Sequence, residues 1–346
     1  MTLSEAFADQ SISCTRLGSP FMGQLFAILA EHWPKGSKLD ARFATFEGDI
    51  GPAGASLPLR LAGGLHALVL SGRAPELAAV YPPNAVQNDK MRVALLTALD
   101  THEVFLLDWV KSAPQTNEVR RSAALMAGAA VLKTYFDSPV WLSELGASGG
   151  LNMMWDHFAL DLVGGRMGPC DAVLTLAPDW EGPMPPLALP EILSRAGVDL
   201  NPLNPRVPAD LLRMTAFLWP DQPERLALTR AAAAVMDAEL SQGDAIDWLA
   251  NRLNEAPAGC VHLIQHTVAW QYFPQDAQCR GLELIEKAGA AATSDKPLAW
   301  LSLETDGDTK GAVGAALTLR LWPGDITLNL GRADFHGRWV RWAGLP

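Results

Sequence analysis

A short apolar run, SPVWLSEL at residues 138–145, ends directly in the glycine-rich turn GASGG at 146–150. An apolar run of this length, bounded by turn residues, is typical of a strand that is buried on both faces of a parallel sheet. The turn is followed by LNMMW, which begins a helix-like segment. A strand, a tight turn and a helix in this order predict the start of an α/β sheet.

The chain has a different pattern on each side of this strand. Residues 1–136 carry apolar residues at helical spacing and almost nothing that alternates with a period of two, so we expect helices there. After residue 137, strand-like and helix-like segments alternate, which predicts a doubly wound parallel sheet. The expected helices are 20–33, 57–72, 90–110, 118–136, 209–218, 221–238, 245–256 and 274–291, and the further expected strands are 192–202, 260–270 and 297–306.

Two further segments complete the expected organisation. Two alternating runs surround PGD in residues 315–332, which predicts a hairpin and so an antiparallel pair that closes the sheet. Residues 151–191 hold several glycines and prolines and one strand-like piece, 172–176, so we interpret them as an insertion. We therefore expect an all-helical N-terminal domain over residues 1–117 and an α/β domain over 118–346.

Composition and charge argue against several classes of protein. Of the 346 residues, 49% are hydrophobic and 19% charged, which suffices for a sizeable core. The net charge of −11 repels polyphosphate, so we expect no nucleic-acid partner. The four cysteines lie far apart without C-x-x-C, so we expect neither a disulfide framework nor a metal site. The N-terminus is acidic and polar, and no apolar stretch reaches about 18 residues, so we expect a cytoplasmic protein without a membrane span.

The glycine turn has a first chemical interpretation as a nucleophile elbow, G-x-S-x-G. Ser148, Asp306 and His336 then come in the order nucleophile, acid, histidine of a serine hydrolase. A nucleophile elbow stands above a sheet of several earlier strands, whereas Ser148 follows the first expected strand. A plain tight turn, in which Ser148 caps a helix, is an equally simple alternative.

The second interpretation is a turn against which a nucleotide lies. The glycines of 146–150 permit close backbone approach, and the helix expected next offers unpaired N–H groups. Glu144 comes just before the turn, at the end of the strand where open α/β sheets bind ligands. Asp199 ends the next expected strand, where it would accept ribose hydroxyls, and Gly243 with Asp244 follow the third, beside the base. Neither G-x-G-x-x-G nor G-K-[ST] occurs, which argues against dinucleotide and Walker-type phosphate sites.

Four segments in this order carry a family resemblance. The segments are ELGASGG, DLNP, GD and LIQHTVAWQY. They resemble the successive cofactor motifs of class I S-adenosylmethionine-dependent methyltransferases, over about residues 137–346. Ser148 stands where that first motif usually has its middle glycine. The whole chain is also similar to a bacterial family of uncharacterised proteins, through LRLAGGLHALVLSGRAPELA, ELGASGGLN, VDLNPLN, WPDQPERL and ADFHGRW.

The resemblance implies a class I methyltransferase-like fold, S-adenosylmethionine as the cofactor and a small molecule as the methyl acceptor. Glu144 and the turn would hold the amino-acid part of the cofactor, Asp199 its ribose, and Asp244 the adenine amine. The cofactor-binding residues that we expect are Glu144, Gly146, Ser148, Gly150, Asp199, Asn201, Gly243, Asp244 and Gln265.

The same resemblance suggests three residues for proton transfer from the acceptor. His266 is the first candidate because an imidazole titrates near neutral pH, and the others are Tyr272 and His336. A buried His266 that is hydrogen-bonded to the backbone is the structural alternative. A protein that binds the cofactor without catalysis, or one that has lost the site, remains an alternative to the methyltransferase.

Overall fold

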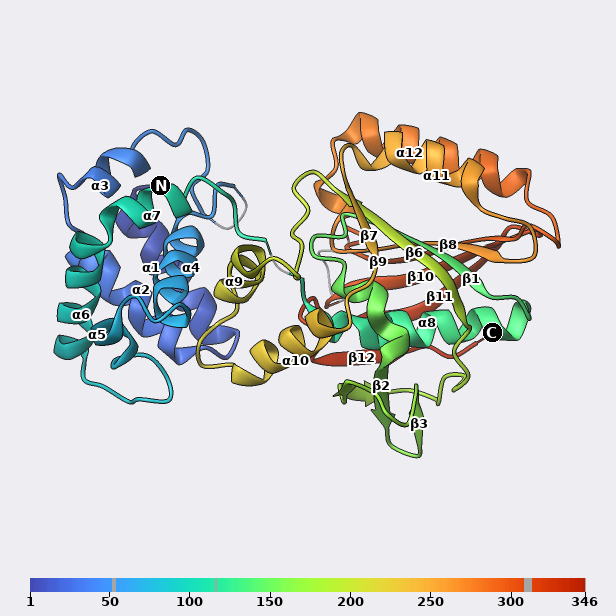
Figure 1. The fold of residues 1–346 in the computed structure, drawn as a ribbon, viewed down its shortest axis with the longest axis horizontal. Coiled ribbons are helices and arrows are strands. Elements are labelled where there is room, and N and C mark those ends of the chain that lie inside the picture. Colours follow the sequence, from blue (N-terminus) through green and yellow to red (C-terminus); the bar gives the residue numbers. More distant parts are fainter. Residues whose placement is uncertain (52–53, 116, 308–312, 346) are drawn as a thin grey trace. The chain divides into compact units, whose positions relative to one another are not determined.

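The computed structural model describes residues 1–51, 54–115, 117–307 and 313–345 (Figure 1). The chain separates into two compact units. The first comprises Met1–Thr116 and Val207–Ala227, and the second comprises Asn117–Arg206 and Leu228–Pro346. In the described ranges, no helix combines the length and the apolar character that crossing a membrane requires.

The first unit is built from helices around an almost completely buried helix, α4. Ten residues of α4 are buried, including Gly63 and Gly64. A Cβ atom on Gly63 would lie 2.5 Å from the ring of Phe217, and one on Gly64 would lie 2.8 Å from Leu106. The glycine pair therefore lets neighbouring side chains reach the helix backbone. The helices are α1 (Leu3–Arg16), α2 (Pro20–His32), α3 (Lys38–Phe43), α4 (Leu57–Leu70), α5 (Pro75–Ala78), α6 (Asn88–Thr101), α7 (Glu103–Trp109) and α9 (Pro208–Ala216).

Residues Val207–Ala227 pack with these helices, whereas we expected them in the later domain, 118–346. The carbonyl oxygen of Ala216 lies 3.1 Å from Nδ1 of the buried His66. Asp221 accepts hydrogen bonds from the hydroxyl of Ser19, at 2.5 Å, and from the backbone N–H of Phe21, at 3.0 Å, at the start of α2. These partners lie far away in sequence, so local periodicity could not reveal them.

We expect Gly63→Val to destabilise the protein by about 1–3 kcal/mol, because the new side chain would overlap the ring of Phe217 in a packed core. Urea unfolding followed by circular dichroism measures the change. Gly243→Ala is the matched control, since in the described part of the chain no residue beyond its sequence neighbours comes within 4 Å of its Cβ position. Equal stability of Gly63→Val and the wild type would contradict this account of the glycine pair.

The second unit contains a large mixed sheet in the order β5-β12-β11-β10-β9-β8-β1-β6-β7 (Figure 1). Strands β7, β6, β1, β8 and β9 are parallel neighbours. Strands β10 and β11 form the expected hairpin, and β12 continues the antiparallel part. The strands are β1 (Val140–Leu145), β5 (Asp179–Glu181), β6 (Ile192–Asp199), β7 (Glu239–Gln242), β8 (Val261–Thr267), β9 (Leu298–Glu304), β10 (Ala315–Trp322), β11 (Ile326–Ala333) and β12 (Trp339–Trp342).

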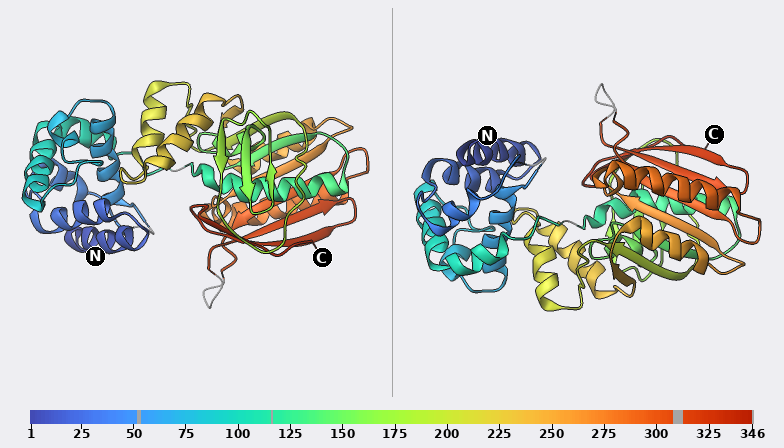
Figure 2. Two further views of the ribbon diagram at one scale, coloured as in Figure 1. Left: turned by 90° about the horizontal axis from the view of Figure 1, so that it is seen from below. Right: turned by 90° about the horizontal axis from the view of Figure 1, so that it is seen from above.

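Helices cover both faces of this sheet (Figures 1 and 2). Helix α8 (Ser122–Tyr135) packs against β9 and β10 on one face. Helices α11 (Ala245–Glu255) and α12 (Gln275–Ala290) cover the other face. Helix α10 (Pro223–Ala234) leads from the first unit into the second. An α/β architecture with a helical N-terminal region is thereby confirmed.

The segment after the glycine turn differs from the helix that we expected there. It is a 3₁₀ segment, η2 (Leu151–His157), which leads into a small separate sheet of order β3-β2-β4. Strands β2 (Phe158–Leu162), β3 (Gly165–Met167) and β4 (Leu174–Leu176) form it, and β4 falls in the expected strand 172–176. The first backbone N–H of η2, that of Leu151, donates to the side chain of Asn117 at 2.9 Å. A 3₁₀ segment therefore stands in place of the expected α-helix, and its first N–H group is already bonded within the protein.

Candidate functional site

The candidate site lies where the order of the parallel strands reverses. Strand β1 pairs with β6 on one side and with β8 on the other, so Glu144 stands opposite Gly197 and Gln265. Asp199 ends β6 beside Gln242 of β7. In open α/β sheets the reversal leaves a crevice at the carboxyl ends of the strands, where ligands bind. The expected residues of β1, β6 and β8 thus meet at one edge of the sheet.

Glu144 is a buried acid at this edge, with 2% of its surface exposed. Burial raises its pKa to about 8. The hydrogen bond to Gln265 and the charge of Arg121 act to lower this pKa, and the charge of Asp199 acts to raise it further. Among the described residues, its Oε2 atom has no hydrogen-bond partner. Buried polar atoms are almost always paired, so this oxygen suits a donor that comes from outside the chain.

The backbone of the glycine turn adopts the positive φ angles that its glycines permit. The φ angle is +69° at Gly146, +72° at Gly150 and +53° at Ser148. A Cβ atom on Gly146 would lie 2.6 Å from that of Ala269, and one on Gly150 would lie 2.7 Å from the side chain of Met236. In this conformation, side chains of the protein itself occupy the space next to both glycines.

Asp199 ties the glycine turn to the end of β6. One carboxylate oxygen accepts a hydrogen bond from the backbone N–H of Ser148 at 2.8 Å, and the other accepts one from Asn201 at 2.9 Å. These two bonds hold the glycine turn and the residues after β6 to the same carboxylate. Asn201 is exposed and takes part here through its backbone.

The ends of β6 and β7 are more open than the glycine turn. Asp244 is exposed, and one of its oxygens caps α11 by accepting from Ile246, at 2.9 Å, and Asp247, at 3.0 Å. Apart from its neighbours in the chain, no described residue has an atom within 4 Å of the Cβ position of Gly243. Leu200, between Asp199 and Asn201, has 75% of its surface exposed. This part of the edge therefore offers an apolar side chain, a glycine and a carboxylate to a flat polar ligand.

His266 does not fit the role of proton acceptor that we expected. It is 1% exposed, and Trp300 donates a hydrogen bond to its Nε2 atom at 2.8 Å. The proton is therefore assigned to Nδ1, which lies 2.8 Å from a carboxylate oxygen of Glu304. Both ring nitrogens are engaged within the protein, so His266 has no lone pair for a substrate proton in this conformation. The structural alternative describes it better, with side-chain partners in place of backbone ones.

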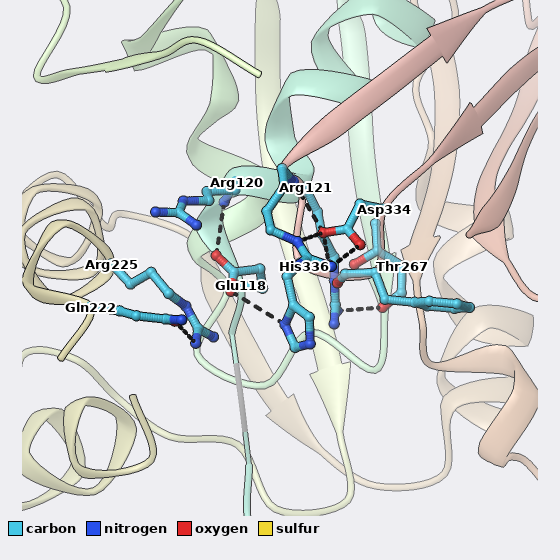
Figure 3. Close-up of polar contacts among 10 residues, drawn as sticks. Glu118, Arg120, Arg121, Gln222, Arg225, Thr267, Asp334 and His336 are labelled. Carbon is cyan, nitrogen blue, oxygen red and sulfur yellow. Dashed lines mark hydrogen bonds and ion pairs between the residues drawn. The ribbon is translucent and has the colours of Figure 1, made fainter. Parts of the chain in front are cut away.

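The other two candidates for proton transfer lie in different surroundings. Tyr272 is 74% exposed. His336 follows β11, and its Nδ1 atom lies 3.8 Å from the buried carboxylate of Glu118 (Figure 3). Arg121 donates to the carbonyl oxygens of Phe335, at 2.8 Å, and Thr267, at 3.3 Å, and so joins the loop of His336 to the end of β8 (Figure 3).

Among the residues that the structure describes, Ser148 does not form the hydrogen bond that a serine hydrolase triad requires. The hydroxyl oxygen of Ser148 is buried and, within the described ranges, has no hydrogen-bond partner. Asp306 pairs with Arg332 at 2.6 Å. A nucleophilic serine requires a histidine within hydrogen-bond reach, so the hydrolase interpretation was wrong.

Several residues of this edge were not expected from the sequence. Trp155 and Asn152 are the partners of the expected Gln265, whose side chain accepts a hydrogen bond from Trp155 at 3.2 Å and donates one to the carbonyl of Asn152 at 3.3 Å. Glu304 ends β9 as Glu144 nearly ends β1, so the same rule of acidic strand ends would have found it. Glu118 and Arg121 precede α8 and follow no strand, so no such signal marked them.

One comparison with known proteins identifies a family. Residues 4–342 match the family model described as "Uncharacterized protein conserved in bacteria (DUF2332)". No curated protein matches the sequence significantly. A solved structure described as "DhpI-SAM-HEP complex" aligns at 11% identity over 81% of this chain and 84% of its own, with a TM-score of 0.20. A superposition this poor carries no argument about the chain.

Proposed function

The chain belongs to the DUF2332 family of bacterial proteins, and we propose that its second unit is an S-adenosylmethionine-dependent methyltransferase that acts on a small molecule. The observation that carries the proposal is the convergence of Glu144, Asp199 and Asp244 at the ends of three neighbouring parallel strands. The strand order β7-β6-β1-β8-β9, with helices on both faces, supports a doubly wound, class I methyltransferase-like sheet.

The residues at this edge fit the cofactor, although one end has to open. At the nucleoside end, the exposed Leu200, the uncrowded Gly243 and the carboxylate of Asp244 suit an adenine ring. At the other end, the unpaired oxygen of Glu144 suits an ammonium group, whose positive charge would favour the ionised form of this buried carboxyl group. Ala269 lies against Gly146 there, so a ligand reaches the turn only after that contact widens.

When bound, S-adenosylmethionine supplies a methyl group on a positively charged sulfur. The task of the protein is to hold and align the reactants. Glu144 would bind the ammonium group, Asp199 the ribose hydroxyls and Asp244 the adenine amine. For an acceptor that has to lose a proton, His336 is the imidazole that the loop after β11 brings to this edge, with Tyr272 as the exposed alternative.

One observation favours a second function, the binding of the cofactor without catalysis. Both nitrogens of His266 are already bonded within the protein, so the histidine next to the reversal of strand order cannot act as a base. A sensor that responds to the cofactor or its demethylated product needs no base.

Isothermal titration of the full-length protein tests the shared part of both functions. We expect S-adenosylmethionine and S-adenosylhomocysteine to bind, and ATP to serve as a non-binding control because the protein is acidic. The absence of binding by both adenosyl compounds at millimolar concentration would refute both functions. If the compounds bind, a second experiment tests for transfer of a labelled methyl group to the small-molecule fraction of a bacterial extract. Transfer would indicate catalysis, and its absence would favour binding alone.

We expect Asp244→Ala to weaken the binding of S-adenosylhomocysteine about tenfold, because one hydrogen bond to a charged group is lost. The same change removes the cap of α11 and costs about 1 kcal/mol of stability. Asp247→Ala is the matched control. Asp247, like Asp244, lies at the start of α11, and both carboxylates lie near the side chain of Arg280 in α12. Equal affinity of the two variants would contradict the role of Asp244 at the adenine.

A further inference from the structure

The segment Val268–Phe273 lies across the point where the strand order reverses. It follows β8 and includes the 3₁₀ turn η3 (Trp270–Tyr272). Its residue Ala269 lies against Gly146, and Phe273 comes within 4.0 Å of the same position. A ligand that enters between the ends of β1 and β8 therefore meets this segment before it meets the glycine turn.

Glu304, at the end of β9, holds the segment in place. One of its oxygens accepts hydrogen bonds from the backbone N–H groups of Ala269, at 2.9 Å, and Trp270, at 3.1 Å. The same oxygen lies 2.8 Å from Nδ1 of His266, whose ring stacks on Trp270 with centroids 5.2 Å apart. Although burial alone would raise the pKa of Glu304, these bonds lower it, so the carboxylate is ionised at neutral pH.

Val268, the first residue of the segment, is strained. Its φ angle is +51°, a region that β-branched side chains rarely adopt and that persists only where the surroundings impose it. Its backbone N–H donates to the carbonyl of Leu303 at 2.9 Å, next to Glu304. Loss of the bonds to Glu304 would let Val268 relax, and the segment would move away from the turn.

We propose that Val268–Phe273 is a lid over the glycine turn, with Val268 as its hinge and Glu304 as the residue that keeps it closed. Glu304 is a positioning residue in this arrangement. Gln278 of α12 provides a second, uncharged attachment, since its side chain donates to the carbonyl oxygens of Trp270, at 3.1 Å, and Phe273, at 2.9 Å. Hydrogen bonds to charged groups are the stronger kind, so Glu304 dominates the closed state.

The lid can be tested without a ligand. Ala269→Cys places a thiol against Gly146, and Cys170→Ser with Cys279→Ser removes the two exposed native thiols. Residue 269 is only partly exposed when the segment lies on the turn, so we expect Glu304→Gln in this background to raise the rate of thiol labelling at least about tenfold, because the thiol becomes fully accessible when the segment moves away. Asp334→Asn is the matched control, since Asp334 is also buried and also accepts two backbone N–H groups, in the loop after β11. Equal labelling of the two variants would overturn the lid.

A second variant keeps the test decisive if Glu304→Gln does not fold. Asn tolerates the conformation of Val268, so Val268→Asn should relieve the strain and slow the labelling by about threefold or more. Faster labelling of Val268→Asn would overturn the hinge.

The role of the lid in ligand entry rests on the proposed function and has its own measurement. Stopped-flow tryptophan fluorescence follows the association of S-adenosylhomocysteine, and we expect a rate constant about tenfold higher for Glu304→Gln than for the wild type. An unchanged rate constant would show that the segment does not gate the site. If the wild type does not bind this compound, the proposed function fails, while the labelling experiment still decides whether the lid exists.

Discussion

Replacing Glu144 by Gln should raise the free energy of unfolding at pH 9 by roughly 4–5 kcal/mol and change it little at pH 4. In the folded protein the pKa of Glu144 is raised from 4.5 to about 8, mainly by burial. A raised carboxyl pKa means that the folded state binds the proton more tightly than the unfolded state does. The contribution of Glu144 to the free energy of unfolding is therefore fully present below pH 4.5 and is lost as the pH rises from 4.5 to about 8. Glutamine cannot ionise, so it avoids that loss.

Urea unfolding of the wild type and Glu144→Gln between pH 4 and pH 9 measures the effect. The difference between the two proteins isolates Glu144, because every other titrating group is common to both. Glu283→Gln, on the exposed side of α12, is the matched control and should follow the wild type. Parallel stability curves for Glu144→Gln and the wild type would show that Glu144 ionises normally in the folded state.

The same substitution separates a structural carboxyl group from a binding one. An apolar site that forces a carboxyl group to stay protonated costs stability, and proteins accept such a cost mostly where the group serves a ligand. If Glu144 binds the ammonium group of the cofactor, Glu144→Gln should be more stable at alkaline pH and bind S-adenosylmethionine more weakly. Greater stability with unchanged affinity would remove Glu144 from the proposed site.

The main elements of the second unit could be predicted because they depend on short stretches of sequence. The apolar runs around β1, β6, β8 and β9 and the alternating runs of the hairpin have the periods of buried and half-buried strands. Once these strands are parallel, residues at their ends meet at one edge of the sheet whatever their separation in sequence. This is why Glu144 and Asp199 could be placed together beforehand.

The partners of these residues could not be predicted, because they come from pairings that the sequence does not encode locally. His266 lost its expected role through Trp300 and Glu304, which reach it only because β8 pairs with β9. The 3₁₀ segment η2 likewise has a distant partner, since the side chain of Asn117 accepts a hydrogen bond from its first N–H group. In the first unit, the contact of Phe217 with Gly63 joins segments that no periodicity connects.

Asp199→Ala should lower the affinity for S-adenosylhomocysteine by roughly 2–3 kcal/mol, or about 30- to 150-fold, if the carboxylate accepts the ribose hydroxyls. It should also destabilise the protein by about 2–3 kcal/mol, because it leaves the N–H of the buried Ser148 without an acceptor. Affinity is measured by isothermal titration well below the midpoint of unfolding, so that all of the variant is folded. Asp161→Ala is the matched control, since that carboxylate forms a half-exposed pair with Arg166.

A loss of affinity alone would not distinguish ribose binding from distortion of the glycine turn, since Asp199 holds Ser148 as well. A thermodynamic cycle does, with the wild type and Asp199→Ala on one axis and S-adenosylhomocysteine and its 2′,3′-dideoxy form on the other. If Asp199 binds the hydroxyls, the wild type should discriminate between the two compounds and Asp199→Ala should not, because the interaction has already been removed. If the substitution lowers the affinity for both compounds equally, Asp199 acts only through the turn. Asp199 would then lose its role at the ribose hydroxyls, and their partner would have to be sought on another residue of this edge.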